Sequence, residues 1–234
     1  MTPHRFPLSF VHSDAGRAEL LPAGASLLLL DSIHAPASFI LLHFLAAALR
    51  KHRPVILLNL SQPAGYWTSL LQKQGIQPES AQYKHLLTTI DQLEQLEPSI
   101  KLQQSSPLVI IDDLSSIIWA SERPADQLID AFQAFLPAQL KSPFSLVSVF
   151  HQDLVHTNKR DREIFNHLIN RYHIILRTRA LGGQGQGELI IQRGPGYLSD
   201  LNLPITLSSE QTTQYKITDN SLSFYPKGLD KAFI

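Results

Sequence analysis

The sequence has no cysteine, and this absence excludes disulfides, cysteine-ligated zinc, iron–sulfur clusters and cysteine nucleophiles together. It also has no excess of charge of one sign, because 20 basic residues balance 20 acidic ones, and a histone-like DNA binder is therefore excluded. The longest apolar stretch, residues 39–49, is far shorter than the roughly 20 residues that a membrane span needs. The N-terminus shows no apolar block followed by a small-residue cleavage site. We therefore expect a soluble intracellular protein.

The chain instead carries many short apolar runs. Hydrophobic residues make up 44% of its 234 residues, which is enough to bury the core of one large α/β domain or two small ones. A polar segment, residues 91–106, is expected to be a surface connection. The patterns predict strands at 26–30, 55–60, 83–90, 108–111, 144–150, 173–178 and 188–192, and helices at 37–49, 66–74, 125–136 and 161–170.

Strands alternate with helices along most of the chain, and strands alone follow near its end. This order predicts an α/β fold with a mostly parallel sheet flanked by helices and an antiparallel C-terminal extension. Residues 214–218 and 221–225 alternate in polarity around Asp219-Asn220, which is typical of a hairpin. We predict a single domain over residues 1–234, in which residues 1–20 form an N-terminal extension and residues 213–234 the C-terminal hairpin and tail.

The segment after the first predicted strand resembles in position the phosphate-binding loop of P-loop ATPases. Such a loop reads G-x-x-x-x-G-K-[ST], so that backbone N–H groups and a lysine hold the phosphates while a hydroxyl holds magnesium. Residues 31–38 read DSIHAPAS, without glycine or lysine. Asp31 would repel phosphate, and Pro36 has no backbone N–H to donate. We predict a degenerate loop that does not bind nucleotide tightly by itself.

Two acidic residues, Asp112 and Asp113, follow the predicted strand 108–111, where an ATPase of this type places its magnesium-binding acid. The alternative is that one of them caps the following turn, with Ser115 and Ser116 helping. Because the loop has no phosphate-binding lysine, we favour the cap.

The remaining motifs indicate no catalytic centre. The glycine-rich residues 182–187 are followed by a strand and not by the helix that a dinucleotide site needs, so they predict a β–β loop. Ten histidines include no H-E-x-x-H spacing, and His151 near Asp153 has no G-x-S-x-G elbow beside it. We expect no catalytic residue, no metal site and no cofactor of the chain's own.

Charge is distributed unevenly along the chain. Residues 61–140 hold four basic and nine acidic residues, whereas residues 141–234 hold eleven basic and eight acidic ones. Lys159, Arg160 and Arg162 fall within the most basic segment, and a local basic patch on a neutral protein can bind phosphate. The alternative is a solvated helix face with paired charges.

Two segments carry a family resemblance. Residues 214–229 (QYKITDNSLSFYPKGL) are similar to the ending of the sixth subunit of the Elongator complex, and this is the most specific match. Residues 109–116 (VIIDDLSS) resemble the acid-ended strand of that family. A helix with His43-Phe44-Leu45 after a loop without glycine fits the family as well. The pieces, in order and spacing, cover nearly the whole chain.

The resemblance implies a RecA-like fold without the usual nucleotide motifs. It implies a heterohexameric ring with Elongator subunits four and five, which joins the catalytic core that modifies the wobble uridine of tRNA. Such a ring binds tRNA and releases it on ATP hydrolysis, so ATP is expected at ring interfaces. No membrane partner is expected, the location is cytoplasmic, and the nucleus is a second location.

Within such a ring, loops after central strands point toward the pore. Lys159, Arg160 and Arg162 then become candidates for binding RNA phosphates. Arg177 or Arg179 could instead reach a nucleotide held by the neighbouring subunit, as an arginine finger does.

The sequence is compatible with three functions. The first is a non-catalytic subunit that works by assembly and RNA contact. The second is an active RecA-like ATPase or recombinase-type DNA motor, which needs a lysine that the 31–38 loop lacks. The third is an unrelated α/β enzyme that uses Asp112 or His151 in a deep pocket at the strand ends.

Overall fold

The computed structural model describes residues 21–103, 105–133, 144–155, 158–182, 185–196, 211–218 and 221–226. The predicted N-terminal extension and the tail after residue 226 lie outside these ranges. So do His156 and the turn residues Asp219-Asn220, together with Gly183 and Gln184 of the glycine-rich stretch.

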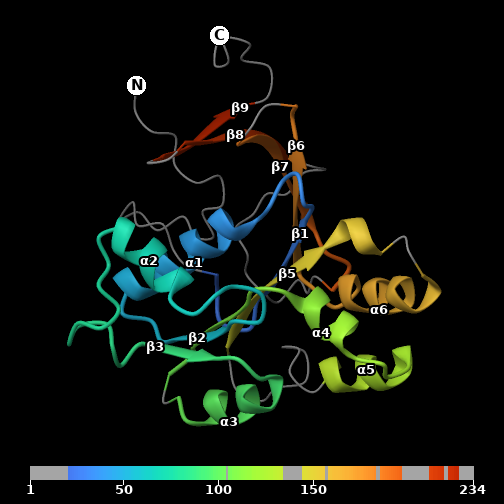
Figure 1. The fold of residues 1–234 in the computed structure, drawn as a ribbon, viewed down its shortest axis with the longest axis horizontal. Coiled ribbons are helices and arrows are strands. Elements are labelled where there is room, and N and C mark those ends of the chain that lie inside the picture. The colour runs from blue at the N-terminus through green and yellow to red at the C-terminus, as the bar shows by residue number, and fades with distance from the viewer. Residues whose placement is uncertain are drawn as a thin grey trace.

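The described strands form one nine-stranded sheet in the order β3-β2-β4-β5-β1-β6-β7-β8-β9 (Figure 1). The strands from β3 to β6 in this order run parallel, whereas β7, β8 and β9 each pair antiparallel with their neighbours. The predicted mostly parallel sheet with an antiparallel C-terminal extension is confirmed. The strands are β1 (Ser26–Asp31), β2 (Val55–Leu58), β3 (Leu87–Ile90), β4 (Leu108–Ile111), β5 (Ser145–His151), β6 (Ile174–Ala180), β7 (Gln186–Arg193), β8 (Gln211–Thr218) and β9 (Ser221–Pro226).

Helices cover both faces of this sheet. In Figure 1, α1 and α2 lie on one side and α4, α5 and α6 on the other. Strand side chains point alternately to the two faces, so Leu27 and Leu29 join the core under α1 while Leu28 and Leu30 join the core under α4 to α6. The helices are α1 (Ser38–Arg50), α2 (Tyr66–Lys73), α3 (Leu96–Lys101), α4 (Leu114–Ala120), α5 (Ala125–Gln133) and α6 (Lys159–Ile169), with short 3₁₀ turns at Leu93–Gln95 and Gln152–Leu154.

Two helices occur where the sequence pattern predicts none. Residues 91–106 were expected to be a surface connection, and that prediction is wrong, because α3 buries Leu96 and Ile100 there. Their spacing of four residues places both side chains on one face of the helix. In the same way, the expected turn after Asp113 is the first turn of α4. Both helices are too short to show a clear period in the sequence.

The strand order determines where the polar strand ends lie. β4, β5 and β1 are neighbours in the sheet and run parallel, so their carboxyl ends meet at one edge. Asp31 at the end of β1 pairs in register with His151 at the end of β5, and Asp112 and Asp113 directly follow β4. None of the helices in the described ranges has the length and apolarity to cross a lipid bilayer.

Candidate functional site

In the loop between β1 and α1, backbone N–H groups donate hydrogen bonds to carboxylates of the protein itself. The buried Asp31 accepts a hydrogen bond at Oδ2 from the backbone N–H of Ala37, over 2.8 Å, at the start of α1. The Ile33 N–H donates to Oδ2 of Asp153 over 2.7 Å. In a phosphate-binding loop, N–H groups at these places would face the anion. Here at least two of them are already bonded to internal anions.

His151 lies between two carboxylates at this edge. Its Nδ1 is 2.5 Å from Oδ1 of Asp31, and its Nε2 is 3.5 Å from Oδ2 of Asp113. The Asp113 and Asp31 carboxylates raise the pKa of His151 to about 10, against a smaller opposing effect of burial. The imidazolium therefore neutralises part of a buried acidic cluster where an ATPase would hold magnesium and phosphate. We call Asp31, Asp113 and His151 the ion triad.

Asp113 also caps a helix, as the sequence suggests. Its Oδ1 accepts the N–H groups of Ser115 and Ser116, over 2.8 and 3.1 Å, at the start of α4. The hydroxyl of Ser115 in turn accepts the backbone N–H of His151 over 2.8 Å. The predicted cap is confirmed, and the same residues hold β5 in place.

Asp112 is bonded in a different direction. Its carboxylate accepts the N–H of Leu60 over 2.7 Å, and both the N–H and the hydroxyl of Ser61. Burial raises the pKa of Asp112, and these hydrogen bonds oppose that rise. Asp112 therefore fastens the segment after β2 to the end of β4. In the part of the chain that the structure describes, no group of three or more side chains is placed to hold a metal ion.

The three basic residues that the sequence singles out, Lys159, Arg160 and Arg162, lie in the first turn of α6 and differ in their contacts. The Arg160 guanidinium donates to the carbonyls of Ile118, Ser121 and Arg123, over 3.2, 2.6 and 2.8 Å, and so joins α6 to the end of α4. Lys159 and Arg162 are exposed. Lys159 lies 3.6 Å from Glu163 one helical turn away, a weak surface pair.

Arg177 and Arg179 lie on β6. Arg177 is half-buried, and its Nε has no hydrogen-bond partner among the described residues. Arg179 is exposed and stands opposite Glu188 of β7 in the sheet register. The two arginines share one face of the strand because side chains two positions apart point the same way.

The sequence pattern missed the central member of the ion triad. The sequence suggests His151 only as a residue of an enzyme site, whereas its partner in the structure, Asp31, lies 120 positions away. The signal that could have found it is its position directly after an apolar strand, at the same edge as the other strand-end acids. Trp119, which is 43% exposed, stacks on the His151 ring with centroids 6.2 Å apart.

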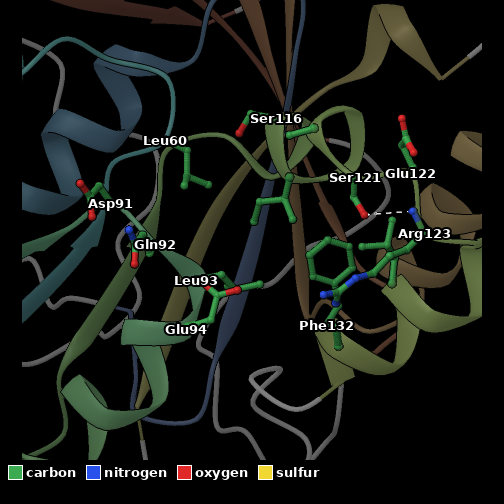
Figure 2. A pocket seen from close by; sticks show the side chains of 14 residues that line it. Leu60, Asp91, Gln92, Leu93, Glu94, Ser116, Ser121, Glu122, Arg123 and Phe132 are labelled. Atoms are coloured by element: carbon green, nitrogen blue, oxygen red, sulfur yellow. Dashed lines mark hydrogen bonds between the residues drawn. The ribbon is translucent and has the colours of Figure 1, made fainter.

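A pocket of about 780 Å³ opens beside α4, between the segment after β3 and the α4–α5 connection (Figure 2). The residues that line it include neither Asp112 nor His151, which are the candidate residues of an unrelated α/β enzyme. The perturbed pKa values of those two residues come from burial, hydrogen bonds and neighbouring carboxylates within the protein.

A family comparison bears directly on this chain. The model of the family described as Elongator subunit Iki1 matches residues 21–179, which is more than half of the chain. The chain belongs to the Elongator subunit Iki1 family. Membership supports a role within Elongator and association with other Elongator subunits. Residues 214–229, the most specific part of the sequence resemblance, lie beyond the matched range. Among curated proteins, no relative matches.

Two solved structures show the fold of this Iki1-family chain. A KaiC-like protein from Pyrococcus horikoshii OT3 superposes with a TM-score of 0.64 at 14% identity, over 96% of this chain and 100% of that one. The flagellar accessory protein FlaH from Methanocaldococcus jannaschii gives a TM-score of 0.60 at 12% identity, over 87% of this chain and 90% of that one. The chain therefore has a RecA/KaiC-like fold, as the sequence predicts.

Proposed function

We propose that this chain is a non-catalytic RecA-like accessory subunit of Elongator, which works by assembly and supports tRNA binding for wobble-uridine modification. One observation carries the proposal: Asp31, Asp113 and His151 pair at the ends of the strands after which a working ATPase has its phosphate-binding loop and magnesium-binding acid. A phosphate there would displace Asp31 from the Ala37 N–H and would face three carboxylates with no lysine. We propose the cytoplasm as the location of the protein, with the nucleus as the alternative location.

The partners we propose are other RecA-like Elongator subunits in a heterohexameric ring attached to the catalytic core. The resemblance assigns subunits four and five as neighbours and the sixth position to this chain. That position stays a prediction, because the matched family description names a subunit and no place in a ring. Native mass spectrometry of the complex recovered from cells should give a ring of about six subunits containing this chain. Recovery only as a monomer would contradict the proposal.

The isolated chain should not bind or hydrolyse ATP. Its loop donors are used internally, so we expect no saturable ATP binding up to about 1 mM and no phosphate release. Isothermal titration calorimetry and a phosphate-release assay on the purified chain measure this directly. ATP turnover by the chain alone, lost in Asp112→Ala, would instead favour the alternative of an active RecA-like ATPase or recombinase-type motor.

If ATP binds at ring interfaces, it would be held by a neighbouring subunit and would contact the surface of this chain. Arg177 and Arg179 are our candidates for contacting a neighbour's nucleotide. Support comes from the exposure of Arg179 and from the half-buried Arg177, whose Nε is buried without a hydrogen-bond partner among the described residues.

For RNA contact, the exposed pair Lys159 and Arg162 gives the cleanest test. In the assembled ring, Lys159→Ala with Arg162→Ala should weaken tRNA binding several-fold. If each contacts one phosphate, the slope of log K against log salt should fall by about 1.5. Arg160 is left intact, because its three carbonyl bonds hold α4 and α6 together.

Filter binding at several salt concentrations measures both quantities. The matched control removes two other exposed basic residues, Lys73 and Lys84, and should leave the slope unchanged. An equal loss in both variants would show that only overall charge matters, and no loss in either would remove α6 from the RNA-binding surface.

A further inference from the structure

The pocket beside α4 combines an apolar interior with an acidic rim. Phe132 and Leu128 are buried, and Leu60, Leu93 and Ile117 pack partly buried against the same core. The exposed rim carries three acidic residues, Asp91, Glu94 and Glu122, and a single basic one, Arg123. Figure 2 shows Asp91 and Glu94 on one side of the pocket and Glu122 on the other, with the Phe132 ring between them.

The walls of this pocket are fixed before any partner arrives. On the α4–α5 side, Arg160 holds the carbonyls of Ser121 and Arg123. On the β2 side, the backbone of Leu60 is bonded to Asp112. A binding surface that is already ordered loses less conformational entropy when a partner binds. The strand-end acids and Arg160 thus act as positioning residues for the pocket.

We propose that this pocket binds a segment of another Elongator subunit that presents a large apolar side chain next to a lysine or arginine. The apolar side chain would pack against the partly buried Leu60, Leu93 and Ile117, as interface anchors do in well-packed pockets. The neighbouring cation would face Glu94 and Glu122, since complementary charge favours association and rejects acidic segments. The excess of acid in residues 61–140, within a chain that is neutral as a whole, supports this choice of partner. The inference rests on the proposed assembly and adds where and with what chemistry it occurs.

The test places a photo-crosslinking benzoylphenylalanine at Gln92, an exposed residue of the rim, in the full chain within the complex recovered from cells. A matched probe at Gln72 of α2 lies on the opposite side of the sheet. We expect Gln92 to crosslink to another Elongator subunit, in a segment with a large apolar residue within about one helical turn of a basic one. The Gln72 probe should not reach that segment.

Charge reversal then tests the chemistry of the rim. Glu94→Lys with Glu122→Lys should lower the yield of the Gln92 crosslink about tenfold, because two attractions become repulsions. Glu79→Lys with Glu97→Lys makes the same change in net charge at exposed residues outside the pocket and should leave the yield unchanged. Urea unfolding of each purified variant checks that the fold is intact.

Several outcomes would overturn the inference. Crosslinks only to residues 134–143 or 227–234 of the same chain would show that the chain fills its own pocket. Crosslinks only to a second copy, only to an acidic segment, or to no protein in an intact complex would also reject it while leaving the proposed function standing. A chain recovered with no Elongator subunit at all would remove the proposed function together with the inference.

Discussion

His151→Ala should lower the free energy of unfolding by about 3 kcal/mol at neutral pH, because it leaves the buried Asp31 and Asp113 facing each other without a cation. This value is at the low end of the free-energy cost of removing one partner from a buried ion pair, because the imidazole is itself about one third exposed. Urea unfolding followed by circular dichroism measures the change. His85→Ala, at an exposed histidine, is the control and should change stability by less than about 0.5 kcal/mol.

The same ion triad predicts a pH dependence with a definite sign. The folded-state pKa of His151, about 10, lies above its ordinary value of 6.5. The imidazolium therefore contributes its full stabilisation below pH 6.5, and the contribution declines as the pH rises toward 10. The stability difference between the wild type and His151→Gln should thus be largest near pH 6 and small near pH 10. A difference that stays constant over this range would show that packing, and not charge, is what His151 contributes.

Arg53→Met should lower the free energy of unfolding by about 3 kcal/mol as well. The half-buried Arg53 donates to the carbonyls of Leu21, Ser106 and Pro107 and to the hydroxyls of Ser106 and Ser145. These acceptors stand just before or at the starts of β1, β4 and β5, and Arg53 itself stands just before β2. Removing the guanidinium takes a charged donor from three chain segments at the edge opposite the ion triad, although the Leu21 and Pro107 carbonyls each keep a hydrogen bond from Ser145.

The measurement is again the unfolding free energy in urea. Arg53→Lys should recover less than half of the loss, because one ammonium cannot match the planar fork that reaches three segments. Arg50→Ala, which removes one exposed hydrogen bond to the Gln74 carbonyl, is the control and should cost less than about 1 kcal/mol. If Arg53→Met is as mild as Arg50→Ala, then the strand starts are held by the sheet alone.

Local patterns were enough to predict much of the fold. The apolar runs that became β1, β2 and β4 are buried along their full lengths, and such runs stand out in any window of the sequence. The hairpin of β8 and β9 is paired as its alternation predicts. By contrast, α3 and α4 have 6 and 7 residues, and their mixed composition did not separate them from loops.

The candidate site was only half visible in the sequence. The sequence alone shows that residues 31–38 lack glycine and lysine. The structure is needed to show which side chains bond to the backbone of this loop instead. Arg160 illustrates the same limit, because its charge suggested RNA while its guanidinium is bonded to three carbonyls at the end of α4.

By itself, then, the order of residues determined the layered α/β class, the strand-rich ending and the lack of glycine and lysine in the 31–38 loop, since each can be read from short segments of the sequence. Only the tertiary structure decided which charges meet. Asp31, Asp113 and His151 come from three separate strand ends, and they touch because β4, β5 and β1 are adjacent and parallel. The acidic-rimmed pocket likewise exists only where α4, α5 and the segment after β3 converge. Such contacts depend on the order of the strands in the sheet, which brings together residues far apart in the sequence, and a local pattern does not encode that order.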